Sequence, residues 1–201
     1  SFLVGENDLA TNWGADNILA DLYLAYDAEK LYVGIRGYCE AANGIVLFVD
    51  RDFGATTGVA NMATLTDGTG DTEGTNNIDD TISNGLNVTV AGFGAEIAFG
   101  ARGYVETPAQ THKGWRGLAD IGNFSWLLDD VSMAVSEDMI ETAIPLSHIW
   151  TTGLPSQGAT LAVFARIVNS DGSATSNQAL PEGYDADHAW NVANIAVIPV
   201  R

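Results

Sequence analysis

Residues 21–37 read DLYLAYDAEKLYVGIRG, and this stretch decides the fold class. On each side of the tetrad 27–30 (Asp-Ala-Glu-Lys), large apolar residues occupy every second position, which is the period of a β-strand with one buried face. Leu22 and Leu24 would point to one side of the first strand, and Tyr23 to the other. The polar tetrad is typical of a turn, so the stretch predicts an antiparallel β-hairpin.

The rest of the chain repeats this pattern of short strands. Ile45–Val49 is an uninterrupted apolar run, which predicts a strand buried on both faces. The other expected strands are Val59–Leu65, Leu86–Ala91, Ala95–Gly100, Val131–Val135, Met139–Ile144, Thr160–Val168 and Val192–Val200. Helical periodicity is confined to one short turn after Pro145, with the proline at its first position.

Strands without intervening helices argue against a parallel sheet. We therefore expect one all-β domain over residues 1–201, an antiparallel β-sandwich of jelly-roll or immunoglobulin-like type with about ten strands. A closed barrel is the alternative.

The charge balance limits the partners of this protein. The 201 residues include 26 Asp and Glu but only 8 Lys and Arg, so the net charge is -18. That is too few basic residues for a nucleic-acid footprint, and anionic lipid surfaces would repel the chain. No run approaches the roughly 20 apolar residues of a membrane-spanning helix, so we expect no membrane insertion. Cations are the favoured partners.

The cysteine content excludes an intrachain disulfide, because Cys39 is the single cysteine. We expect it buried in a strand. Low lysine content, abundant Gly, Thr and Asn, and strong acidity favour a secreted protein, extracellular or on a cell surface. The chain would be a mature secreted protein or an excised domain.

A long polar stretch, Thr66–Asn84, alternates acids with glycines. Calcium takes six to eight oxygen ligands on a flexible backbone, which this composition supplies. The expected ligands of a structural calcium ion are Asp67, Asp71, Glu73, Asp79 and Asp80. The spacing is not that of an EF-hand, and a solvated acidic loop is the alternative. Asp50 and Asp52 form a second oxygen-rich corner that caps a turn or shares a cation with the loop.

No catalytic motif is present. Gly-x-Ser-x-Gly is missing, and the three histidines lie far apart in the sequence. Glu96, Glu106 and Glu141 leave a pair of carboxylates open, and Glu141 is expected on the solvent-facing side of an edge strand. We expect a protein that is not an enzyme.

The five tryptophans suit sugar binding, because an exposed indole can stack on the face of a pyranose ring. The candidate ligand-binding residues are Trp13, Trp115, Arg116, Glu106 and Trp190. Trp126 and Trp150 are expected in the core.

Several phrases together resemble the CBM9-like and DOMON-like group of secreted β-sandwich domains. They are Asn12–Gly14, Asp21–Gly34, Ile45–Asp52, Ile140–Leu146 and Asp171–Pro181. The resemblance implies a β-sandwich fold. It also implies a sugar-binding module, often with structural calcium, or a domain that binds haem or sugar.

Two functions of different classes follow. The first is a non-catalytic extracellular carbohydrate-binding module stabilised by calcium. The alternative is a structural subunit of a cell-surface layer, filament or adhesive assembly, in which Ile195–Val200 pairs as an edge strand with another copy. The partner is then a glycan, or other copies of the chain on a cell surface.

Overall fold

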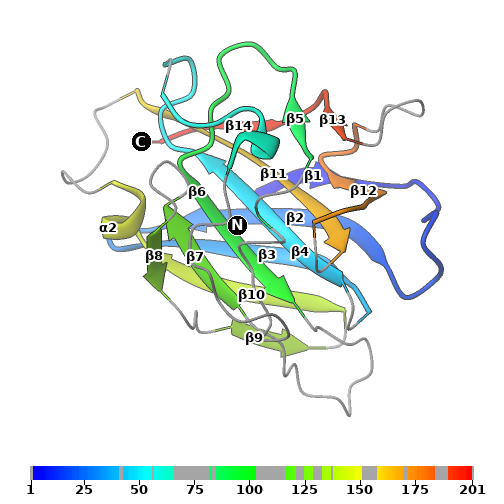
Figure 1. Ribbon diagram of the computed structural model, residues 1–201. Helices are drawn as coiled ribbons and strands as arrows, with labels where there is room; N and C mark the ends of the chain where they lie inside the picture. Colours follow the sequence, from blue (N-terminus) through cyan, green and yellow to red (C-terminus); the bar gives the residue numbers. More distant parts are fainter. Residues whose placement is uncertain are drawn as a thin grey trace.

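Two antiparallel β-sheets pack face to face in the computed structural model, which confirms the expected all-β sandwich (Figure 1). The structure describes residues 2–40, 43–55, 57–65, 82, 85–102, 116–120, 125–128, 133–136, 138–150, 158–169, 172–183 and 190–200. In Figure 1, β4 and β6 of one sheet cross over β2 and β3 of the other. Within the described part of the chain, no helix has the length and hydrophobicity needed to cross a membrane.

The first sheet has five strands in the order β1-β2-β3-β10-β9. Their bounds are β1 (Phe2–Glu6), β2 (Ile18–Tyr26), β3 (Lys30–Tyr38), β10 (Met139–Pro145) and β9 (Met133–Ser136). The predicted hairpin is confirmed as β2 and β3, and Asp27 fixes its turn by accepting hydrogen bonds from the backbone N–H groups of Glu29 and Lys30. The prediction that Glu141 lies on an edge strand is wrong, because β10 pairs with β3 on one side and β9 on the other.

The second sheet follows the order β12-β11-β4-β6-β7-β8, and β14 also pairs with β11. Its strands are β12 (Thr175–Leu180), β11 (Thr160–Asn169), β4 (Asn43–Asp50), β6 (Ile97–Arg102), β7 (Arg116–Asp120), β8 (Ser125–Leu128) and β14 (Ala196–Pro199). A short parallel pair, β5 (Asn87–Val88) with β13 (Asn191–Val192), forms a separate two-stranded sheet. The remaining elements are η1 (Met62–Thr64) and α2 (Leu146–Ile149).

Strand β4 shows that the centre of the second sheet is covered on both faces. Ile45, Leu47 and Val49 join the core between the sheets, whereas Val46 and Phe48 join a second apolar cluster on the opposite face of β4. All five are fully buried, as predicted for this run. The second sheet is thus covered on both faces at β4, β6 and β11, whereas the outer face of β2, β3 and β10 carries exposed side chains such as Tyr32 and Glu141.

A polar network ties the 7–17 segment to β12. The Gln178 side-chain oxygen accepts hydrogen bonds from the Asn7 side chain and the Leu19 backbone. Asn12 and Asn177 exchange reciprocal bonds between backbone N–H groups and side-chain oxygens. These bonds bring together two segments that carry the family resemblance, Asn12–Gly14 and Asp171–Pro181. They also satisfy the hydrogen-bonding groups of the buried amide side chains.

The structure corrects or refines four local predictions of secondary structure and burial. Val59–Leu65 is not a strand: it makes isolated bridges and then forms η1, where the Asn61 side chain caps the Ala63 N–H group. The expected strand Val192–Val200 is divided between β13 and β14. The helical turn after Pro145 is confirmed as α2, but the proline is its N-cap and not its first residue. Cys39 is buried as predicted, but it follows the last residue of β3 instead of lying in the strand.

Candidate functional site

The outer face of the five-stranded sheet carries an ordered array of side chains. The register of β2, β3 and β10 places them in three rows, namely Asp21–Arg36–Met139, Tyr23–Gly34–Glu141 and Ala25–Tyr32–Ala143. Successive side chains of a strand point to opposite faces. The alternate residues of β2 and β3, such as Leu24 and Val33, are accordingly buried in the core.

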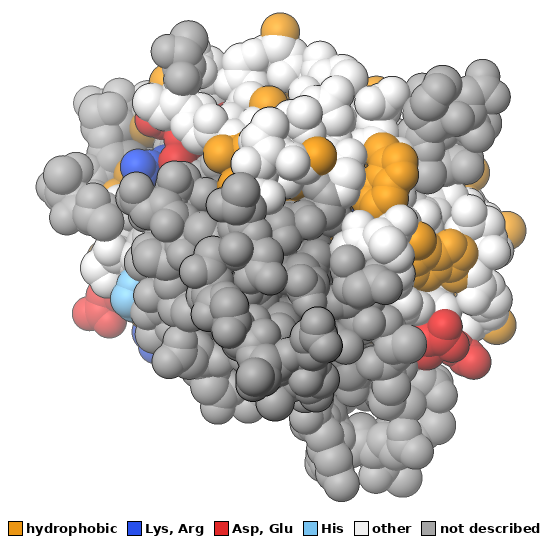
Figure 2. Space-filling model, viewed as in Figure 1, with side chains coloured by type: hydrophobic (Ala, Val, Ile, Leu, Met, Phe, Trp, Pro, Cys, Tyr) orange, Lys and Arg blue, Asp and Glu red, His pale blue; other side chains and the backbone are white. Residues whose placement is uncertain are grey.

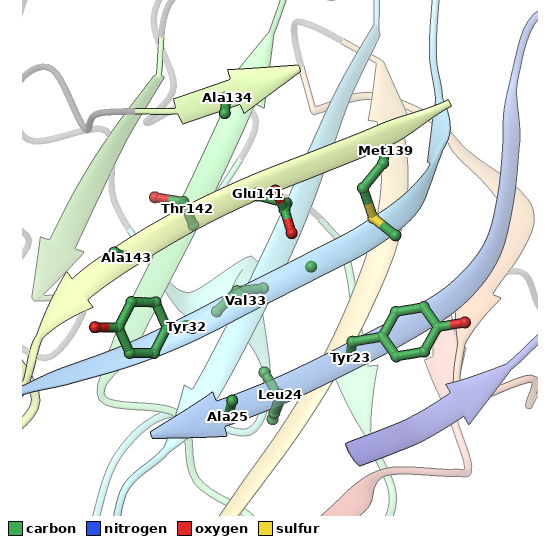
Figure 3. Close-up of a pocket in the computed structure, with 11 residues that line it drawn as sticks. Tyr23, Leu24, Ala25, Tyr32, Val33, Ala134, Met139, Glu141, Thr142 and Ala143 are labelled. Carbon is green, nitrogen blue, oxygen red and sulfur yellow. The ribbon is translucent and has the colours of Figure 1, made fainter. Parts of the chain in front are cut away.

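A hollow of about 480 Å³ lies over these rows. Tyr23 and Tyr32 project from neighbouring strands, and Met139 and Glu141 from β10 (Figure 3). Gly34 leaves the middle of the hollow empty, since a Cβ there would meet the Tyr23 Cβ at 3.5 Å and the Met139 sulfur at 3.7 Å. These are ordinary contact distances, so a methyl group fits at position 34, whereas a larger side chain there would enter the hollow.

Carboxylates hold both tyrosine rings in place. The Tyr32 hydroxyl donates a hydrogen bond of 2.7 Å to Asp27 Oδ2, and the Tyr23 hydroxyl donates one of 3.2 Å to Asp21 Oδ2. The hydrogen bond to Asp27 raises the pKa of Tyr32, and partial desolvation followed by the Asp21 charge raises the pKa of Tyr23. Both phenols therefore stay neutral at physiological pH, with their orientation fixed.

The charged side chains around the hollow differ in whether they have a partner of opposite charge. Arg36 Nε donates to Asp21 Oδ2 at 2.5 Å, and this contact raises the pKa of the guanidinium group. The Glu141 side chain is exposed and has no hydrogen bond or ion pair with any residue that the structure describes. Figure 2, which shows another face of the molecule, has few basic side chains and no cluster of them among the coloured residues.

This face has the features of a ligand site. Fixed aromatic rings supply apolar area at little entropic cost, and a small number of polar groups fix the orientation of a ligand. The hydroxyl-bearing, partly apolar surface of a sugar ring is complementary to such an arrangement.

A second candidate site is an acidic corner made by Asp50, Asp52 and Glu96. One carboxylate oxygen from each lies within 4.8 Å of the others, so the three can hold a metal ion. Asp50 ends β4, and Glu96 immediately precedes β6, its paired neighbour. Asp50 and Glu96 are buried, and Asp52 is half-buried. The predicted oxygen-rich corner of Asp50 and Asp52 therefore gains a third carboxylate.

Backbone and hydroxyl donors position the acidic corner. Asp50 accepts hydrogen bonds from the N–H groups of Asp52 and Gly94, both at 2.9 Å. Glu96 accepts from the Arg51 N–H group at 3.0 Å. It also shares the single proton of the Thr57 hydroxyl with Asp52, whose carboxylate oxygen lies 2.8 Å from that hydroxyl and the Glu96 oxygen 2.7 Å. A side chain at residue 94 would collide with the Thr57 carbonyl oxygen, so glycine is required where this N–H group reaches Asp50.

Burial destabilises the state of the acidic corner in which all three carboxylates are charged. It raises the pKa of Asp50 and of Glu96, and repulsion from the Asp52 carboxylate adds to both shifts. Within the described ranges no Lys or Arg forms an ion pair with these groups. Protons or a bound cation would relieve the repulsion.

The sequence-predicted ligand residues are spread over the molecule. Trp13 is half-buried against the core between the sheets, and Trp190 packs on the second cluster, over Gly85. These clusters lie on opposite faces of the second sheet, so the structure does not bring the two indoles together. Arg116 begins β7, where only the backbone is described. The other predicted residues lie outside the described ranges, namely Glu106, Trp115, Asp67, Asp71, Glu73, Asp79 and Asp80.

Sequence reasoning missed the hollow, although its signal was present. Tyr23 and Tyr32 occupy the outward positions of the hairpin, and Gly34 separates them on the same face. Two aromatic residues on the polar side of an amphipathic hairpin are the pattern to look for. Glu96 and Glu141 were candidates for a carboxylate pair, but the structure places them on different sheets, and strand pairing brings each to its own site.

Comparison of the chain with protein-family models, curated proteins and solved structures finds no significant match.

Proposed function

We propose that this protein is a non-catalytic, extracellular carbohydrate-binding module stabilised by calcium. The observation that carries the proposal is the pair of carboxylate-held tyrosines, Tyr23 and Tyr32, on either side of the hollow at Gly34. The resemblance to CBM9-like and DOMON-like domains supports the same function. Acidity and the lack of basic residues support an extracellular setting.

The ligand would lie across β2, β3 and β10. One sugar ring stacks on Tyr32, which is 41% exposed, and the next lies over Gly34 towards Tyr23. Glu141 and Arg36 border this path and offer an acceptor and a donor to ring hydroxyls. A shallow site of this kind fits a chain-like glycan better than a small enclosed ligand.

Calcium is the cation that best suits the acidic corner. The three carboxylates offer only oxygen, the ligand atom preferred by calcium, whereas zinc sites use nitrogen and sulfur. A bound ion would join the end of β4 to the start of β6 and offset the repulsion between Asp50 and Glu96. Its role would be structural, since the corner lies at strand ends and apart from the hollow.

Calorimetric titration with β-linked oligosaccharides tests the proposed function. Replacing Tyr32 with Ala removes a stacking surface and is expected to weaken binding by about tenfold, the equivalent of roughly 1.4 kcal/mol. Tyr32→Phe keeps the ring and should retain most of the affinity. Val197→Ala, on the distant strand β14, serves as a surface control. Equal affinity of wild type and Tyr32→Ala for every glycan bound would contradict the proposal.

A second candidate function has one specific observation in its favour. Apolar side chains are exposed on two neighbouring edge strands, with Phe2 69% and Leu3 46% exposed on β1 and Val197 45% exposed on β14. Such edges can pair with another copy, as in a structural subunit of a surface assembly. Light scattering after size exclusion distinguishes the two, because growth into large species that Val197→Lys abolishes would favour the subunit.

A further inference from the structure

We infer that the hollow on the five-stranded sheet selects glycans that carry protonated amines, that is, polymers of 2-amino-2-deoxy sugars. This inference rests on the proposed carbohydrate-binding function and specifies its ligand class. It comes from the charges around the hollow and from the position of one carboxylate between two aromatic rings.

Negative groups outnumber positive ones on this face, where Glu141 lines the hollow and the other charged side chains surround it. The carboxylates that line it or act on its tyrosines and arginine are Glu6, Asp21, Asp27, Glu29, Asp138 and Glu141. The cations are Arg36 and Lys30. Six carboxylates against two cations leave four negative charges in excess, on a chain that is itself strongly acidic. A cationic ligand is attracted to this face and an anionic one is repelled.

Two of these carboxylates, Asp21 and Asp27, have donors among the described residues. Asp21 accepts from Arg36 and Tyr23, and Asp27 accepts from Tyr32 and two backbone N–H groups. No described residue donates to the Glu141 carboxylate, and unlike Glu6, Glu29 and Asp138 it lines the hollow itself. It is the carboxylate in the hollow that is left for a ligand.

The strand register places this carboxylate where a ligand ammonium group could contact it and the tyrosine rings at the same time. Glu141 and Tyr23 pair with Gly34 from opposite sides, so their backbones are about 10 Å apart across two strand spacings. Tyr32 is the diagonal neighbour on the same face. A cation above Gly34 would lie between the Glu141 carboxylate and the tyrosine rings, combining a charge-assisted hydrogen bond with cation–π attraction.

Neutral sugars would gain the stacking without the charge. An N-acetylated amine has lost its positive charge, and uronate sugars would place a carboxylate beside Glu141. Selectivity thus arises from attraction of the amine and repulsion of the acid.

The experiment compares three β-1,4-linked oligosaccharides of equal length, made of glucosamine, N-acetylglucosamine or glucose. Each is titrated at low and physiological salt into wild type, Glu141→Gln, Tyr32→Ala and the control Asp16→Asn. Asp16 is an exposed carboxylate in the 7–17 segment, outside the hollow, so its loss changes the net charge equally. Melting temperatures confirm that each variant is folded.

The wild type is expected to bind the glucosamine oligomer at least about tenfold more tightly than the glucose oligomer, and less so as salt rises. Glu141→Gln should abolish this preference, Asp16→Asn should keep it, and Tyr32→Ala should weaken binding of all three.

Two results would overturn the inference while the proposed function stands. In one, the glucose oligomer binds through Tyr32 with no amine preference. In the other, Glu141→Gln keeps the preference, so that attraction of a polycation to an acidic surface explains it. If none of the three oligomers binds, both the inference and the proposed function fail.

Discussion

Replacing Asp52 with Asn should remove the response of the protein to calcium while leaving the metal-free fold intact. Asp52 is half-buried, and its one described side-chain contact is a 2.8 Å bond that its Oδ1 accepts from the Thr57 hydroxyl. An asparagine carbonyl can accept that same bond. The structural cost is therefore about 0.5 kcal/mol or less, and the loss of repulsion towards Asp50 and Glu96 works against it.

The stabilisation by calcium that this variant should lose is much larger than the structural cost of the substitution. A ligand present at 100 times its dissociation constant stabilises the folded state by about 2.7 kcal/mol. For a domain of this size, each kcal/mol shifts the melting temperature by roughly 2–4 °C. Calcium should therefore raise the wild-type melting temperature by about 5–11 °C. Asp52→Asn should show little of this rise, although its melting temperature in EDTA matches the wild type.

Differential scanning calorimetry in EDTA and in excess calcium provides the assay, with Asp16→Asn as the matched control. Asp16→Asn removes one carboxylate outside the acidic corner and should keep the full calcium response. A wild type insensitive to calcium, or an Asp52→Asn protein that responds like the wild type, would refute the acidic corner as the calcium site. Asp71→Asn in the same assay tests the acids of residues 67–80, because only a site in that stretch would make this variant lose the response.

Two further predictions concern the pH response and the hollow. Burial raises the pKa of Asp50 and Glu96, so the folded state holds these protons more tightly than the unfolded chain. In EDTA, the free energy of unfolding should fall as pH rises from the ordinary carboxyl pKa through the raised values. Melting curves of Asp50→Asn should show a shallower fall. If the variant and the wild type fall equally, Asp50 is not the source of the pH dependence. Gly34→Phe should fill the hollow and weaken glycan binding by more than about tenfold, whereas Gly34→Ala should bind normally, because a Cβ fits there at ordinary contact distances. Titration measures both variants, and unchanged binding by a folded Gly34→Phe protein would exclude the hollow.

The local sequence determined several of the strands, and for the β2–β3 hairpin and β4 it also determined which faces are buried. Period-two alternation predicts the β2–β3 hairpin and its inward leucines, and an unbroken apolar run predicts that β4 is buried on both faces. These features depend on neighbours within a few residues, where side-chain direction follows directly from backbone geometry. The same alternation fails for Val59–Leu65, because the Asn61 side chain caps a helical turn there.

Tertiary structure decided which residues form the candidate sites. Tyr23, Tyr32 and Gly34 share a face for a local reason, but Glu141 joins them only because β10 pairs with β3 instead of lying at an edge. In the acidic corner, Glu96 accepts from Arg51, 45 residues earlier, because β4 and β6 are neighbours in the second sheet. Strand order and register depend on how whole sheets bury their apolar faces against each other, and no short stretch of sequence contains that information.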